Sequence, residues 1–230
     1  MTTQPAISYS IVVIGNFNPV IFQTEWLRRY KILPEQEITA SLTENVVAEP
    51  TPNVQIIEGY RTFISPQKTE LNFPSYKLLV LPVRFQFSTQ KKDCSLEMVG
   101  STIKMFELLS HTPITAIGIN FNAHLNITDC DRILMQLFNV NSEKAKGIFG
   151  EGYKVGGKFF IERAKYKIRV VIEPSEVIKD GIYVAINFHR KIESRHTDEL
   201  LPALRNYEND VKEAEKITQH LLNLKEAVFI

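Results

Sequence analysis

The chain carries a run of basic residues whose alternation is typical of a strand able to contact phosphate groups. Within residues 163–169 every second residue is Lys or Arg, so a strand there would place its positive charges on one face. Two further basic residues follow, and residues 152–195 hold ten basic against five acidic side chains. These candidates are Arg163, Lys165, Lys167, Arg169, Arg190 and Lys191. They favour a surface for nucleic acid or an acidic partner. The alternative is a solvated edge strand, because charged side chains on an edge discourage aggregation.

Amide and imidazole side chains form a second group with chemical potential. Their spacing of two within each predicted strand places them on one face of that strand. The group comprises Asn120, Asn122, His124, Asn187 and His189. If the two strands are neighbours, these side chains form a polar patch able to hydrogen-bond a ligand, or to support an enzyme. The alternative is an ordinary solvated sheet face.

The other reactive residues predict no catalytic or metal centre. Cys94 and Cys130 are the only cysteines, and the histidines show no metal-ligand spacing. The glycines of residues 147–157 resemble a phosphate loop, but a strand pattern follows Lys158 where such a loop requires a helix. We therefore expect free thiols, a hairpin or loop at the glycines, and no cofactor or metal.

The C-terminal region has the clearest helical pattern in the sequence. Apolar residues recur at spacings of three and four over residues 197–227, which predicts one long amphipathic helix. The stripe includes Leu204, Tyr207, Val211, Ala214, Leu221 and Leu224. It is suited either to sealing the sheet of its own chain or to pairing with a second copy in a homodimer.

The remaining pattern predicts two halves with a similar order of elements. In residues 1–110 we expect strands at 7–14, 38–42, 54–64, 70–73 and 76–88, and helices at 19–31 and 95–109. In residues 111–230 we expect strands at 114–124, 158–162, 164–172 and 182–190, and helices at 128–139 and 197–227. Each half therefore reads as β-α-β(3-4)-α. This predicts an α+β fold in which two half-domains share a mainly antiparallel curved sheet, with a long C-terminal helix.

Short motifs recur at the same offset and support an internal repeat. The triplet Asn-Phe-Asn stands at 16–18 and again at 120–122, 104 residues later. Val-Arg-Phe-Gln at 83–86 matches Ile-Asn-Phe-His at 186–189 in the last strand of each half. These matches favour a duplication of a unit of about one hundred residues.

This duplicated order resembles the fold of the TATA-binding protein family. The resemblance covers nearly the whole chain, is one of architecture, and implies a curved sheet with helices on its convex side. That family reads DNA with an asparagine early in the first strand of each half and kinks it with phenylalanine pairs. Here those asparagine positions hold Ser8 or Ser10 and Thr112 or Thr115.

Composition limits the function classes. Twenty-seven basic and 26 acidic residues give a net charge of +1, which excludes a strongly basic polyanion-binding protein. The sequence shows neither a signal peptide nor an apolar run of membrane-spanning length, so we expect a cytoplasmic location and no membrane partner. We predict a binding or assembly protein rather than an enzyme, acting through the sheet and the C-terminal helix as a homodimer or with another protein. Nucleic-acid binding by the basic strand is the alternative.

Overall fold

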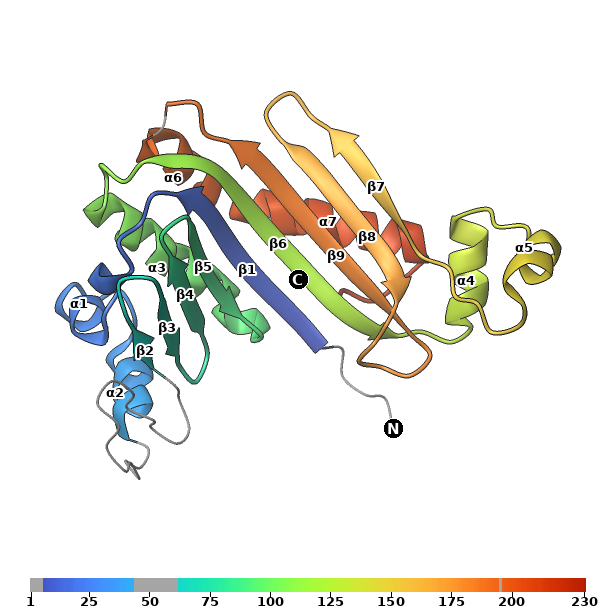
Figure 1. Cartoon of the computed structure of the whole chain (residues 1–230), viewed down its shortest axis with the longest axis horizontal. Coiled ribbons are helices and arrows are strands. Elements are labelled where there is room, and N and C mark those ends of the chain that lie inside the picture. The colour runs from blue at the N-terminus through green and yellow to red at the C-terminus, as the bar shows by residue number, and fades with distance from the viewer. Residues whose placement is uncertain (1–5, 44–61, 195) are drawn as a thin grey trace. The chain divides into compact units, whose positions relative to one another are not determined.

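The computed structural model describes residues 6–43, 62–194 and 196–230 (Figure 1). Its strands form one nine-stranded antiparallel sheet in the order β2-β3-β4-β5-β1-β6-β9-β8-β7. The strands are β1 (Ala6–Gly15), β2 (Phe63–Ile64), β3 (Thr69–Asn72), β4 (Lys77–Leu81), β5 (Arg84–Thr89), β6 (Ile114–Asn126), β7 (Gly157–Glu162), β8 (Lys167–Pro174) and β9 (Gly181–Lys191). The predicted α+β class with an antiparallel sheet and a C-terminal helix is confirmed.

Both halves of the chain use one strand order. The first strand of each half lies beside the last: β1 neighbours β5 and β6 neighbours β9, while β1 and β6 are adjacent in the middle of the sheet. The sequence predicts the order of elements along each half and a shared antiparallel sheet, but not which strands are neighbours in it. An origin by duplication stays a prediction.

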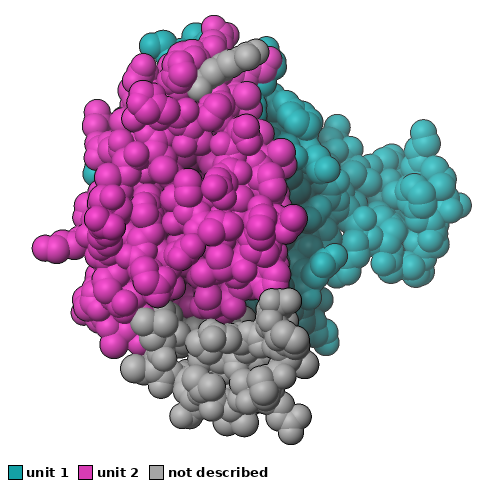
Figure 2. All heavy atoms as spheres, turned by 60° about the vertical axis from the view of Figure 1, so that its left-hand side comes forward, with its two compact units in different colours: residues 1–8, 120–189, 208–230 teal, residues 9–119, 190–207 magenta. Residues whose placement is uncertain are grey.

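The chain divides into two compact units, which are coloured separately in Figure 2. Unit 1 contains residues 1–8, 120–189 and 208–230, and unit 2 contains residues 9–119 and 190–207. Three strands, β1, β6 and β9, contribute residues to both units.

Unit 2 is built on an aromatic core between strands and helix α3. Its helical elements are η1 (Pro19–Ile21), α1 (Thr24–Arg29), α2 (Glu35–Thr43), η2 (Lys92–Cys94), α3 (Ser95–Leu108) and α6 (Thr197–Arg205). The register pairs Val13 with Phe85, so both side chains point to the same buried side. The Phe85 ring meets Phe106 of α3 edge to face at 5.1 Å. The alternation of strand residues and the spacing of helix residues thus supply one core.

Unit 1 contains β7, β8, most of β9, part of β6, α4 (Cys130–Leu137), α5 (Ser142–Phe149) and nearly all of α7 (Tyr207–Leu222). Helix α7 lies on one face of these strands, and the face toward the reader in Figure 1 carries no helix of this unit. Phe121 and Phe188 point to the α7 side and meet at 5.8 Å, and Phe229 packs on Phe121. The tail returns because the buried Glu215 carboxylate accepts the backbone N–H groups of Val228 and Phe229.

The C-terminal helical region differs from the predicted single helix over 197–227. It consists of α6 and α7, separated at Asn206, and α7 ends at Leu222. Asn223 follows in the left-handed conformation (φ 52°), a common way to terminate a helix. Leu204, Tyr207, Val211 and Ala214 are buried within the chain, while Leu221 and Leu224 are half-buried. Most of the predicted stripe therefore packs inside its own molecule.

Other elements also differ from the expectations. The segment that contains the glycines, expected as a hairpin or loop, begins inside a helix, because Gly147 belongs to α5. Residues 38–42, expected as a strand, belong to helix α2, whose start after Pro34 carries Glu35 and Glu37 in its first turn. Residues 76–88 form the hairpin of β4 and β5, because Pro82 and Val83 make a tight turn. The helix expected over 19–31 consists of η1 and α1. The strand expected at 54–64 lies mostly outside the described residues.

Candidate functional site

The exposed sheet face of unit 1 carries charged, amide, imidazole and aromatic side chains. We call it the open face and define it by the register of β7, β8 and β9, together with the β6 side chains that contact the outward-facing side chains of β9. Lys167, Arg169, Val171 and Glu173 stand opposite His189, Asn187, Ala185 and Tyr183 respectively. On the other side of β8, Glu162, Phe160 and Lys158 stand opposite Lys167, Arg169 and Val171. The alternate residues of these strands, such as Ile168 and Ile186, are buried under α7.

The predicted amide patch is assembled on this face. Asn187 donates its side-chain N–H to the Oδ1 of Asn120 at 2.7 Å. Tyr183 donates its hydroxyl to the Oδ1 of Asn122 at 3.4 Å, and Asn122 donates to the Ser8 hydroxyl at 3.2 Å. These bonds orient the three amides on the sheet face.

The two predicted histidines lie at different ends of the open face. His124 stacks on Tyr183 with ring centroids 4.6 Å apart, and its Nδ1 lies 2.9 Å from the Ser175 hydroxyl. Burial, and then the nearby Glu173 carboxylate, raise the pKa of Tyr183. His189 stands opposite Lys167, six residues along β9 from Tyr183, which corresponds to about 20 Å. One small-molecule site therefore cannot contain both imidazoles.

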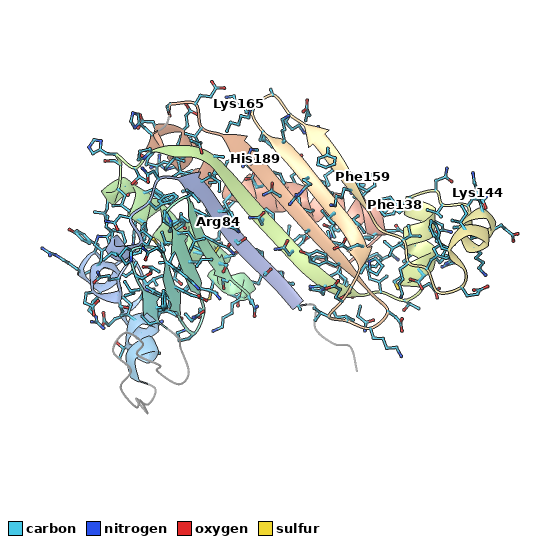
Figure 3. The ribbon with its side chains drawn as sticks, viewed as in Figure 1. Arg84, Phe138, Lys144, Phe159, Lys165 and His189 are labelled. Atoms are coloured by element: carbon cyan, nitrogen blue, oxygen red, sulfur yellow. The ribbon has the colours of Figure 1, made fainter. Side chains whose placement is uncertain are left out.

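The predicted basic group does not form one strand face. Lys167 and Arg169 lie on β8 and are exposed on the open face, but residues 163–166 form the turn between β7 and β8. Arg163 pairs with Glu213 of α7 at 3.3 Å, and Lys165 is exposed in the turn (Figure 3). Two of the four alternating cations thus stay on the predicted face.

The remaining basic candidates separate in the same way. Arg190 is buried because it follows Phe188 on the inward side of β9, whereas Lys191 at the end of β9 is exposed. Arg190 is therefore not on the surface proposed for it. The alternation of β9 contains this information, since the even-numbered residues 182–188 are its apolar set.

Charge on the open face is mixed but leaves accessible cations. Lys167 forms an ion pair with Glu162 at 2.6 Å, which lowers the pKa of that carboxyl group. Within the described residues, no carboxylate lies within ion-pair distance of Arg169 or Lys158. These two guanidinium and ammonium groups are available to a bound anion.

An exposed aromatic ring, absent from the sequence-based candidates, completes the open face. Phe160 is 74% exposed and stands opposite Arg169 in the register. Phe159 points to the α7 side and stacks on Phe138 at 5.5 Å (Figure 3). The Phe-Phe pair was a signal, because consecutive residues of a strand face opposite ways and one of the two rings had to face outward.

A groove lies on the other side of β7, between this strand and α7. Its volume is about 700 Å³. The apolar lining includes Phe159, Ile161, Val170, Ile217 and Leu221, and Lys212 and Lys216 of α7 also border it. Because β7 is the last strand of the sheet order, the groove lies beneath a strand edge that no other strand of the described residues covers.

The two cysteines are free thiols that differ in burial. Cys130 is buried, and its burial, followed by the charge of Asp131, raises the pKa of the thiol. Cys94 is half-buried. In the part of the chain that the structure describes, no cluster of His, Cys, Asp and Glu is placed to hold a metal ion, and no helix is long and apolar enough to cross a bilayer.

Comparison with protein-family models and with curated proteins gave no match to this chain.

Proposed function

We propose that this chain is a binding protein that holds single-stranded nucleic acid on the open face of unit 1. The observation that carries the proposal is the juxtaposition of the exposed Phe160 ring with Arg169, next to the hydrogen-bonded amides of β6 and β9. These are the three kinds of group that single strands require from a protein: a stacking surface, cations and base-edge partners.

Phe160 supplies the stacking surface. A base stacked on an exposed aromatic ring contributes about 1–3 kcal/mol to binding, largely without regard to sequence. The bases of a duplex are already stacked and cannot reach a ring on a sheet face. An exposed ring in the middle of a strand therefore favours single strands.

The cations supply phosphate contacts. Arg169 and Lys158 flank Phe160 on the open face, and neither has an acidic partner among the described residues. Each phosphate contact in a single strand contributes about −0.7 to the slope of log K against log salt. Two contacts predict a shallow slope of about −1.4, consistent with the near-neutral charge of the chain.

The amides supply base recognition. Asn120, Asn122 and Asn187 are fixed by bonds to one another's strands and to Tyr183 and Ser8, so they are positioned before a ligand arrives. A side-chain amide offers a donor and an acceptor together, which matches the edge of an unpaired base.

Fluorescence anisotropy with labelled single-stranded RNA, single-stranded DNA and duplex DNA of equal length, in a salt series, tests the proposal. We expect single strands to bind more tightly than the duplex. Phe160→Ala should weaken single-strand binding roughly tenfold. Arg169→Ala should weaken it and make the salt slope shallower by about 0.7.

Lys179→Ala is the matched control, because Lys179 is an exposed cation in the loop between β8 and β9. It should leave binding unchanged. Equal affinity for duplex and single strands, or binding that neither Phe160→Ala nor Arg169→Ala weakens, would overturn the proposal.

A further inference from the structure

Among the strands that the structure describes, none pairs with the outer edge of β7. This strand pairs with β8 on one side and ends the sheet order on the other. An open strand edge presents unpaired backbone N–H and C=O groups and is a template for a further strand. β7 itself is short and rich in aromatic and aliphatic residues, with one Lys and one Glu.

The hydrogen-bond pattern identifies the residues that face outward. The Arg163 N–H donates to the Tyr166 carbonyl at 2.9 Å, so this pair at the hairpin turn is hydrogen-bonded. In an antiparallel ladder such pairs alternate, and therefore Ile161 and Phe159 bond to β8. Lys158, Phe160 and Glu162 then direct their backbone groups away from β8, along the free edge.

We propose that a second copy of this chain pairs antiparallel with β7 along this edge, with a twofold axis at Phe160. In this register Lys158 stands opposite Glu162 of the partner subunit, and Phe160 opposite Phe160 of the partner subunit. All three outward-facing residues of each copy then form hydrogen-bonded pairs, with two bonds in each pair.

Charge complementarity selects the second copy and the register. Side chains directly opposite each other in a ladder lie close together, so opposite charges stabilise the pairing and like charges destabilise it. In the twofold register both Lys158 side chains meet Glu162 side chains on the open face. A shift by two residues leaves an outward-facing residue of each copy without a partner and places Phe160 opposite a charged residue.

The groove side is also complementary. In the same register Phe159 stands opposite Ile161 of the partner subunit, and both residue types line the groove between β7 and α7. Pairing therefore places additional apolar side chains beside an apolar surface that is otherwise open to solvent. The inference does not depend on nucleic-acid binding.

Sedimentation velocity of the purified full chain, from about 1 to about 200 µM, tests the pairing, since an interface this small predicts weak association. We expect a reversible monomer–dimer equilibrium. Lys158→Glu and Glu162→Lys each place like charges opposite each other at two symmetric positions. Each should raise the dissociation constant about tenfold or more.

Combining the two charge variants tests whether Lys158 faces Glu162 of the partner subunit. The double variant Lys158→Glu/Glu162→Lys restores opposite charges and should associate within about threefold of the unaltered chain. An equimolar mixture of the two single variants should form heterodimers, because every facing pair is then Lys with Glu. The contact of Glu162 with Lys167 is not restored in the double variant, so recovery reports the pairing between copies.

Phe160→Pro blocks the edge by a second route. It removes an outward-facing N–H without removing a bond to β8, and should give a monomer with an unchanged far-ultraviolet circular dichroism spectrum. Lys179→Glu and Glu176→Lys, both exposed in the loop between β8 and β9, are charge controls that should dimerise normally.

A chain that stays monomeric at every concentration would overturn the proposal. So would a dimer that all three β7 substitutions leave intact, or single-charge variants that weaken association without recovery in the double variant. These measurements contain no nucleic acid, and Arg169→Ala leaves the β7 edge unaltered. Sedimentation therefore tests the dimer and fluorescence anisotropy tests nucleic-acid binding, so that either proposal can fail without the other.

Discussion

Glu70 shows how one carboxylate makes the stability of unit 2 depend on pH. It forms ion pairs with Lys68 and Lys77, and these contacts hold the pKa of Glu70 below its ordinary value of 4.5. A lowered pKa stabilises the folded chain above pH 4.5, and this contribution is lost as pH falls through the folded value. Because the lysines are substantially exposed, the contribution is up to about 1 kcal/mol.

Glu70→Gln should therefore lower the free energy of unfolding at pH 7. The difference from the unaltered chain should shrink as pH falls below 4.5, where the carboxylate of the unaltered chain also becomes protonated. Urea unfolding at pH 7, 5 and 3 measures it. A difference that stays constant over this range would show that the ion pairs do not set the effect.

At the same scale, strand alternation was enough to predict which polar residues share a face, but not which basic residues do. Asn120, Asn122 and Asn187 lie together because each belongs to a strand with an unambiguous apolar phase. The residues between the cations of 163–169 do not form an unambiguous apolar set of this kind, because Ala164 and Tyr166 are as compatible with a turn as with a strand. The turn uses residues 163–166 and removes Arg163 and Lys165 from the face.

At the scale of elements, substitutions of two glycines test how the segment of α4 and α5 packs against β7. A Cβ on Gly157 of β7 would come within 2.4 Å of the Phe138 ring, which follows α4 and stacks on Phe159. Gly157→Ala should therefore displace Phe138 and destabilise the chain by about 1–2 kcal/mol. In a Phe138→Ala background the same change should cost little, and a double-mutant cycle by urea unfolding measures the difference.

Gly147 is the matched control. It lies within α5, and a Cβ there meets nothing within 4 Å. Gly147→Ala should stabilise by about 0.5–1 kcal/mol through backbone entropy. If both glycine substitutions changed the free energy of unfolding in the same direction, the close contact of Gly157 with Phe138 would not explain the effect of Gly157→Ala.

Elements whose apolar residues recur regularly along their whole length were predictable from the sequence. Helix ends and breaks that depend on the conformation of single residues were not. Helix α3 and strands β6 and β9 follow their apolar spacing closely. The apolar stripe of the C-terminal region correctly predicts which side of the helices is buried. It does not predict the break at Asn206 or the left-handed conformation of Asn223. The return of the tail to Glu215 depends on contacts between residues 13 and 14 positions apart, which periodicity does not encode.

At the scale of the whole molecule, strand continuity predicts how the two units unfold. Strands β1, β6 and β9 each contribute residues to both units, so loss of the ladder at one end of a strand removes the ordered backbone that continues it. Such a chain should unfold in one cooperative transition. Trp26, the single tryptophan, lies in unit 2 against Phe22 and reports on that unit alone.

A substitution in unit 1 therefore tests whether the two units unfold together. Phe121→Leu removes part of a fully buried ring in unit 1 and should cost about 1–2 kcal/mol. It should shift the urea midpoint of Trp26 fluorescence as much as that of far-ultraviolet circular dichroism. Phe106→Leu in the core of unit 2 gives the reference shift. A Trp26 transition that ignores Phe121→Leu while circular dichroism resolves two steps would mean that the shared strands do not couple the units.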